Sequence, residues 1–359
     1  MKQQTFWVVV LASALTVSIL LTAGCAGCAA TVEEAAGDSN LLTMMTWNVH
    51  NLFDGEDNGY EYDEFLQSSG WNAEKYRGRI NSLTDAIKRI EPQPDILMLQ
   101  EIESLKILED LSRSLDSGYS WSHFAGNPGS AIGLGIISRR PLLDAKIHSI
   151  TIDGDTAPRP VLEARIQNLV IFVCHWKSKI GGDEATESTR RACARVILRR
   201  VKELWENESD LGIVIAGDLN QNHDEFYRQN ASMICALLPD DIYCAQASGG
   251  MQKDFIVISK SIPPVPINFP EKTITFYSPW IKELEKGSYF YKNNWETIDH
   301  FLLSPQLFGS SSWKYEKTKI INIAPFANPS GIPAPYSSRT GLGMSDHLPL
   351  MLFLTAGGQ

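Results

Sequence analysis

The sequence predicts an α/β fold in which two sheets pack together and helices cover their outer faces. Apolar runs typical of strands alternate with segments whose apolar residues recur at helical spacing, and consecutive strands occur in both halves of the chain. No internal repeat or low-complexity stretch divides residues 41–359, so this part of the 359-residue chain is expected to form one domain.

The expected elements follow in order from residue 43 onward. Helical spacing of apolar residues predicts helices over residues 74–90, 104–115 and 187–206. Short apolar runs predict strands over residues 43–49, 95–101, 119–124, 133–138, 161–166, 169–175, 212–216, 297–303 and 348–354. The segment 237–291 is rich in proline and aromatic residues and is expected to form long loops.

The N-terminal residues are expected to direct export. Lys2 precedes an apolar run over residues 6–21, which is short for a membrane span and typical of a signal segment ending at residue 24. The sequence at Cys25 is similar to a bacterial lipoprotein signal, in which this cysteine carries the lipid, although Thr22 stands where Leu is usual. An ordinary cleaved signal is the alternative. Residues 25–40 are small, polar and acidic, which suits a flexible tether on the periplasmic or outer face of a membrane.

Charge and cysteine content narrow the classes of protein. The formal net charge of −10 argues against capture of nucleic acid over the whole surface, but it leaves room for a local basic groove. No spacing of Cys and His residues is typical of a structural zinc site. A disulfide between Cys235 and Cys244 is compatible with export, and the sequence leaves it open.

Polar residues suited to metal binding or proton transfer lie at the ends of several predicted strands and near the C-terminus. They are Asn48, Glu101, His175, Asp218, Asn220, Asp299, Asp346 and His347. Strands whose ends carry such residues form a rigid scaffold that can bring charge to one cleft. Carboxylate oxygens are the ligands that a hard cation such as Mg²⁺ prefers, and one or two of them suffice.

The order of these residues resembles the endonuclease/exonuclease/phosphatase superfamily, whose fold is DNase I-like. The match is most specific at Gly217-Asp218-Leu219-Asn220 and at Ser345-Asp346-His347-Leu348-Pro349, and it extends over nearly the whole chain after the signal segment. The resemblance implies a four-layered α-β-β-α sandwich of two mixed sheets. It also implies Mg²⁺, or Mn²⁺, held by Asn48, Glu101 and Asp346. The family often has Asp where this chain has His50, which leaves the number and kind of metal ions open.

The resemblance also implies catalytic roles. Asp218 would orient or deprotonate the attacking water, and Asn220 and His175 would donate hydrogen bonds to phosphoryl oxygens. Asp299 would fix the tautomer of His347, which contacts the scissile phosphate. Taken alone, an Asp-x-Asn sequence is also common in turns, and a single histidine at a strand end is usually structural.

Four further residues are candidates for substrate binding. Arg159 matches a phosphate-contacting arginine of the family, and Lys177 and Lys179 alternate with Trp176 and Ser178 in a pattern that suits a phosphate backbone. A solvated loop explains these two lysines equally well. Asn127 lies in a Gly-Asn-Pro-Gly sequence that is also typical of a plain turn.

The sequence therefore predicts a metal-dependent phosphodiesterase, and specifically an extracytoplasmic nuclease that acts as a monomer on nucleic acid. A phosphatase or phospholipase-type enzyme for a lipid or small phosphate ester is the alternative, because loops and not shared catalytic residues set specificity. A third reading is a lipoprotein that keeps the fold without activity. DNA and RNA, and cleavage within a strand or from its end, are not distinguished.

Overall fold

The structure, a computed structural model, describes residues 40–115, 118–246, 254–267 and 273–357. The predicted signal segment, Cys25 and all of the tether except Asn40 lie outside the described residues. Within the described residues, no helix has the length and apolar character needed to cross a membrane.

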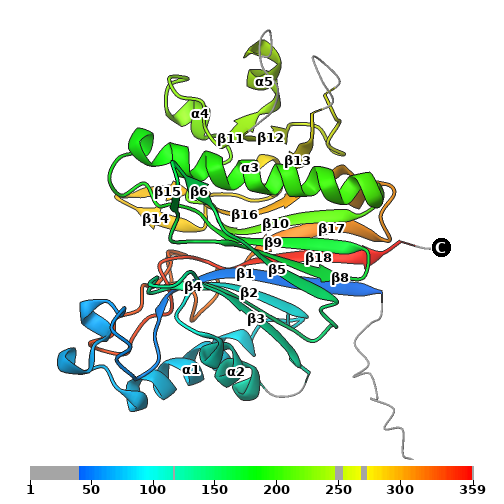
Figure 1. The fold of residues 1–359 in the computed structure, drawn as a ribbon. Coiled ribbons are helices and arrows are strands. Elements are labelled where there is room, and N and C mark those ends of the chain that lie inside the picture. Colours follow the sequence, from blue (N-terminus) through cyan, green and yellow to red (C-terminus); the bar gives the residue numbers. More distant parts are fainter. Residues whose placement is uncertain (1–39, 116–117, 247–253, 268–272, 358–359) are drawn as a thin grey trace, which may run out of the picture. The chain divides into compact units, whose positions relative to one another are not determined.

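Two mixed sheets form the centre of the fold (Figure 1). The six-stranded sheet has the order β17-β18-β1-β2-β4-β3 and contains β1 (Leu41–Leu52), β2 (Ile96–Ile102), β3 (Trp121–Ala125), β4 (Gly133–Ser138), β17 (Trp313–Ile320) and β18 (Leu350–Ala356). The eight-stranded sheet has the order β11-β12-β13-β16-β10-β9-β8-β5 and contains β5 (Asp144–His148), β8 (Val161–Ile166), β9 (Leu169–His175), β10 (Gly212–Asp218), β11 (Leu237–Pro239), β12 (Ile256–Ser259), β13 (Thr275–Tyr277) and β16 (Asp299–Leu303). Parallel pairs such as β1 with β2 and antiparallel pairs such as β1 with β18 occur in the same sheet.

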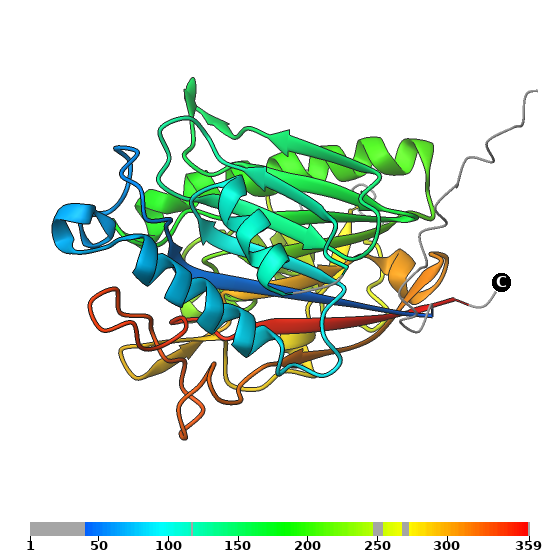
Figure 2. The same ribbon diagram turned by 90° about the horizontal axis from the view of Figure 1, so that it is seen from below.

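Helices cover the outer faces of the two sheets, as Figures 1 and 2 show. Helices α1 (Ala73–Ile87) and α2 (Leu105–Ser114) pack on the six-stranded sheet, and α3 (Asp183–Asn207) packs on the eight-stranded sheet. The smaller elements are α4 (Glu225–Arg228), α5 (Asp240–Gln246), the ribbons β6 (Thr151–Ile152) with β7 (Asp155–Thr156) and β14 (Tyr289–Tyr291) with β15 (Asn294–Glu296), and the 3₁₀ turns η1 (Asp63–Phe65), η2 (Gln67–Ser69), η3 (Pro279–Ile281) and η4 (Pro305–Phe308).

Alternation of side chains along the strands explains this layering. In β10, Val214 belongs to the core between the sheets, whereas its neighbours Ile213 and Ile215 belong to the core beneath α3. Met44 and Met45 of β1 divide in the same way between the inter-sheet core and the core beneath α1 and α2. Strands buried on both faces read as continuous apolar runs, which is why these were the clearest strands in the sequence. The predicted four-layered α-β-β-α sandwich is confirmed.

One expectation from the sequence needs correction, and one open question is answered. The segment 237–291 is not only loop, because it contributes β11, β12, β13 and α5 to one edge of the eight-stranded sheet. Strands of three or four residues are too short for a side-chain period to be visible in the sequence. Cys235 is buried and Cys244 is exposed, and both are free thiols, so the structure forms no disulfide between them.

Candidate active site

Three of the predicted catalytic residues lie side by side on neighbouring strands. Asp218 ends β10 and is in register with His175 of β9 on one side and with Asp299 of β16 on the other. β16 is antiparallel to β10, so its first residue reaches the edge of the sheet at which β9 and β10 end. The sheet order alone therefore brings together residues that are more than forty positions apart in the sequence.

The six-stranded sheet supplies Asn48 and Glu101 at the same edge. Both of its central strands depart from regular pairing here, with register shifts between Asn48 and Leu52 and around Glu101. Glu101 has a positive φ of 65°, which is uncommon for a residue with a side chain. A bulge of this kind re-aims one side chain, and its effect is to turn the Glu101 carboxylate toward the other sheet.

Asn48 joins the two sheets at this point. Its buried Nδ2 donates hydrogen bonds to Oε1 of Glu101 at 3.0 Å and to Oδ2 of Asp218 at 3.1 Å. Its Oδ1 accepts the backbone N–H of His50 at 3.0 Å. Asn48 therefore orients two carboxylates, and its expected place as a metal ligand stays a prediction.

The predicted pair of Asp299 and His347 forms in the structure. His347 Nδ1 lies 2.8 Å from Oδ2 of Asp299, and that oxygen also accepts the hydroxyl of Ser288 at 2.6 Å. These contacts assign the proton of the neutral imidazole to Nδ1 and leave Nε2 facing Asp218, whose Oδ2 lies 3.9 Å away. Tyr289 covers the ring, with the two ring centroids 4.7 Å apart.

The charges around these groups set their protonation. Burial opposes the charged form of His347, but the carboxylates of Asp299, Asp346 and Asp218 outweigh it and raise its pKa well above the usual value. Burial raises the pKa of Asp218 to about 7, with His347 acting in the opposite direction. His175 is fully buried, and burial together with the positive charges of Arg159 and His347 lowers its pKa well below the usual value. Near neutral pH His347 is therefore protonated, His175 is neutral, and Asp218 is close to the midpoint of its titration.

Two groups of side chains are candidates for a metal site. Donor atoms of Asp218, Asp299 and His347 all lie within 4.8 Å of one another. In this group Nδ1 of His347 is paired with Oδ2 of Asp299, whereas the buried Oδ1 of Asp299 accepts no hydrogen bond from the described residues. Glu101 and Asp346 are the more accessible carboxylates, with side chains 16% and 27% exposed. Carboxylate oxygens at an open side of the centre fit a hard cation such as Mg²⁺. His50, which replaces the usual Asp, lies with Nδ1 3.8 Å from Oδ1 of Asp346.

The candidates for substrate binding divide into two groups. Arg159 and Lys177 line a pocket that opens beside His175, which also lines it. Lys179 instead pairs with Glu225 at 2.7 Å and faces Glu296 at 3.7 Å. Asn127 donates its amide to the backbone oxygen of Ala157 at 2.5 Å, which joins two segments that are 30 positions apart in the sequence.

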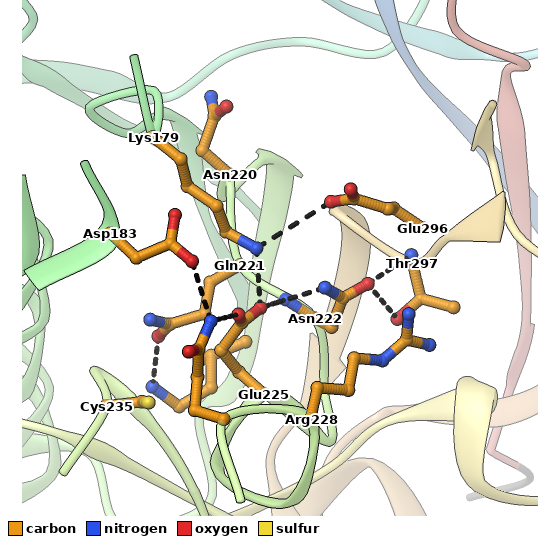
Figure 3. Close-up of polar contacts among 12 residues, drawn as sticks. Lys179, Asp183, Asn220, Gln221, Asn222, Glu225, Arg228, Cys235, Glu296 and Thr297 are labelled. Carbon is orange, nitrogen blue, oxygen red and sulfur yellow. Dashed lines mark hydrogen bonds and ion pairs between the residues drawn. The ribbon is translucent and has the colours of Figure 1, made fainter. Parts of the chain in front are cut away.

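Lys179 belongs to a polar network beneath the loop that follows β10 (Figure 3). Glu225 accepts hydrogen bonds from Lys179 and from both the backbone and the side chain of Asn222, at 2.7 to 2.9 Å. Asn222 in turn accepts the backbone N–H of Thr297, two residues before Asp299. This network fixes the loop of Asp218 against the start of β16, so Lys179 is a positioning residue.

Three residues at the site escaped the sequence analysis. Ser288 and Tyr289 contact the pair of Asp299 and His347, and Tyr62 lies in the pocket beside Arg159. Their segments are irregular or have strands of three residues, so neither period nor motif singles them out.

The pairing of His347 with Asp299 can be tested without substrate. Replacing Asp299 with Asn removes the nearest opposite charge and should lower the pKa of His347 by about 1 to 3, which histidine NMR titration of the metal-free protein would measure. The resonance of the exposed His123 serves as the internal reference. A His347 resonance that titrates alike in both proteins would show that the pair does not form.

Comparisons with known proteins place the chain in a family. A sequence profile described as "Endonuclease/Exonuclease/phosphatase family" matches residues 43–234. No curated protein matches the sequence. One similar solved structure is a humanized D. rerio TDP2, with 15% sequence identity and a TM-score of 0.49, and the match covers 88% of this chain and 99% of that chain. A family protein from Bacteroides thetaiotaomicron also has 15% sequence identity and a TM-score of 0.49, and the match covers 89% of this chain and 98% of that chain. A third is the mannosyl-6-phosphatase Bt3783 of B. thetaiotaomicron, with 15% sequence identity and a TM-score of 0.48, and the match covers 88% of this chain and 99% of that chain. The profile match covers more than half of the sequence, and the chain belongs to the endonuclease/exonuclease/phosphatase family.

Proposed function

We propose that the chain is a metal-dependent phosphodiesterase, and specifically a nuclease that acts outside the cytoplasm. The observation that carries the proposal is the facing pair of Asp218 and His347, with Oδ2 and Nε2 3.9 Å apart at an edge that also holds Glu101 and Asp346. One of these groups can accept a proton near neutral pH and the other can donate one, which is what hydrolysis of a phosphate ester needs.

The residues of the chain divide the chemistry between them. Asp218, with a pKa of about 7, takes the proton from an attacking water. His347 carries a proton that it can give to the leaving oxygen, while Asp299 keeps the imidazole in place. Neutral His175 and Asn220 donate hydrogen bonds to the non-bridging phosphoryl oxygens. A cation held by Glu101 and Asp346 would neutralise charge on the phosphate when bound.

Two unpaired cations favour a nucleic acid as the substrate. Among the described residues, Lys177 and Arg159 have no carboxylate within ion-pair distance, although the chain as a whole is acidic. Counterion release by such residues supplies much of the affinity of proteins for a phosphate backbone.

The lipid-directed alternative also has an observation in its favour. Exposed apolar side chains occur on loops around the site, namely Tyr60, Ile180, Tyr291 and Leu342, with exposures of 58%, 83%, 49% and 71%. Ile180 follows β9, and Tyr291 lies two residues from the tyrosine that covers His347. Such a rim would suit contact with a membrane surface.

Activity against a panel of substrates tests the function. Purified protein with Mg²⁺ or Mn²⁺ should cut plasmid DNA or RNA, chelation should abolish the reaction, and added metal should restore it. Glu101→Gln removes a ligand charge at nearly constant volume, so it should raise the metal concentration needed by tenfold or more while melting stays near wild type. Full activity in chelator would refute metal dependence. Cleavage of phosphoinositide or sphingomyelin with no action on nucleic acid would establish the alternative.

Lys177 and Lys179 should respond differently to replacement by Ala. Loss of one phosphate contact at Lys177 should raise KM for duplex DNA and flatten the log-log salt dependence by about 0.9. Lys179→Ala should leave that slope unchanged. It should instead lower the free energy of unfolding by roughly 1–3 kcal/mol, because the buried Glu225 loses its charged partner. Equal changes of slope in both variants would contradict the division of roles.

We further propose export and lipid anchoring at Cys25, on the sequence at residues 1–24 and the small, polar tether after it. Radiolabelled palmitate should be incorporated by the wild type and not by Cys25→Ser in a bacterial host. Labelling that persists in the variant would refute the anchor at this position.

A further inference from the structure

A pocket of about 440 Å³ adjoins the catalytic centre and has no role in the chemistry described above. His175 lines it, and Nε2 of this residue lies 3.5 Å from Oδ2 of Asp218, so one side chain borders both the pocket and the catalytic centre. Its volume falls in the range of small-molecule sites, roughly 300–1,000 Å³, and exceeds the needs of one phosphate group.

The charge of the pocket has one sign. Arg159 and Lys177 line it, and none of the described residues that line it carries a carboxylate. Burial lowers the pKa of Lys177, and the positive charges of Arg159 and Arg190 lower it further, so the cations repel one another in the absence of an anion. Lys179, two residues further along the same loop, differs from Lys177 because it forms an ion pair with Glu225.

Arg159 is held at the boundary between pocket and centre. Its Nη1 donates a hydrogen bond to the backbone oxygen of Trp176 at 2.6 Å, and Asn220 donates its amide to the same oxygen at 3.1 Å. An anion bound at Arg159 would therefore lie close to Asn220, which is proposed to donate a hydrogen bond to the scissile phosphate.

Two tyrosines form the other wall. Tyr62 packs edge-on against the buried Phe53 with ring centroids 5.4 Å apart, which anchors it while 42% of the residue stays exposed. Burial raises the pKa of Tyr62, the negative charge of Glu101 raises it further, and the positive charge of Arg159 opposes this. Tyr60 is 58% exposed and lies against the turn at Gly129, where an added Cβ would be 3.9 Å from its ring.

We propose that this pocket is a subsite for the nucleotide next to the scissile phosphodiester, with its base against Tyr60 and Tyr62 and its phosphate at Arg159 and Lys177. The inference rests on the proposed nuclease function. An aromatic face stacks on any base, so the pocket would favour a nucleic acid over a simple phosphate ester without selecting a sequence. The turn that closes the pocket is preformed, because Ser130 donates its hydroxyl to the backbone oxygen of Pro158 at 2.7 Å.

Short oligonucleotides test the subsite directly on the full-length protein with Mg²⁺. A dinucleotide with one phosphodiester is the reference, and it is extended on its 5′ or its 3′ side by one nucleotide through a phosphorothioate, which keeps the charge and resists hydrolysis. One of the two extensions should raise kcat/KM by roughly tenfold, the scale of one stacked base. An abasic extension or a neutral methylphosphonate linkage on that side should each lose part of this gain.

Variants connect the gain to the pocket. Tyr60→Ala with Tyr62→Ala should bring the ratio of kcat/KM for the extended and reference substrates close to one, and the abasic extension should then be cut as well as the normal one. Tyr60→Phe with Tyr62→Phe keeps both aromatic faces and should keep the ratio. Arg159→Gln should remove the effect of the methylphosphonate. Two control variants outside the pocket should keep the wild-type ratio. They are Tyr227→Ala on α4, where the tyrosine is 42% exposed like Tyr62, and Lys146→Ala on β5.

The outcomes separate the two proposals. Cleavage of the reference and of both extended substrates with equal kcat/KM would overturn the subsite and leave the nuclease function standing. An unchanged ratio in the tyrosine-to-alanine variant would do the same. Failure of the wild type to cut any oligonucleotide or long nucleic acid, while it hydrolyses a lipid or sugar phosphate, would overturn the nuclease function itself.

Discussion

The repulsion between carboxylates at one edge of the sandwich is the constraint on which the rest of the site depends. Glu101, Asp218, Asp299 and Asp346 come from four segments of the chain. Strand pairing brings the first three together, and Asp346 lies in the segment before β18. Like charges at this distance destabilise the folded chain unless something offsets them. In this structure the protonated His347 provides the main compensating charge, because three of these carboxylates act on it.

Neutral donors complete the compensation without adding charge. Asn48 shares its amide between Glu101 and Asp218, and the backbone N–H groups of Asn51 and Asn220 each donate to one of these carboxylates. Such donors leave negative charge available for a cation, whereas a further salt bridge would cancel it. The proposed acid-base pair and the proposed metal-binding carboxylates therefore share one electrostatic arrangement.

The backbone at this edge departs from regular geometry in order to make these contacts. His50, Asn51, Glu101 and Asn220 all have positive φ, and such residues cost of order 1–3 kcal/mol each when the conformation is strained. Gly217 has φ 128° and approaches the carbonyl of Cys174 so closely that a Cβ would lie 2.0 Å from its oxygen. Here the reason for a glycine ahead of Asp218 is steric, and the sandwich around it stabilises the strained edge.

Sequence reasoning succeeded where a residue stands at the end of a long buried strand. The ends of β9 and β10 and the start of β16 could be located to within two residues because their apolar runs are continuous, and their pairing follows from the fold class. It was less successful for Lys179, since alternation along a loop does not reveal that Glu225, 46 positions later, turns the side chain inward. Tyr60 and Tyr62 were missed because an acidic, irregular loop has no period that would distinguish a pocket wall from a solvated turn.

The distribution of charge around the centre resolves an apparent conflict between an acidic protein and an anionic substrate. Three of the carboxylates in the proposed acid-base and metal sites, Asp218, Asp299 and Asp346, lie around His347, whereas Arg159 and Lys177 line the pocket beside His175. A polyanion that approaches from the basic side meets uncompensated cations first, and it meets the carboxylates only where a metal ion would neutralise them. Screening over about 8–10 Å limits the reach of the remaining surface charge, so binding of the proposed nucleic-acid substrate would depend on the local sign of charge at the pocket and not on the net charge of −10.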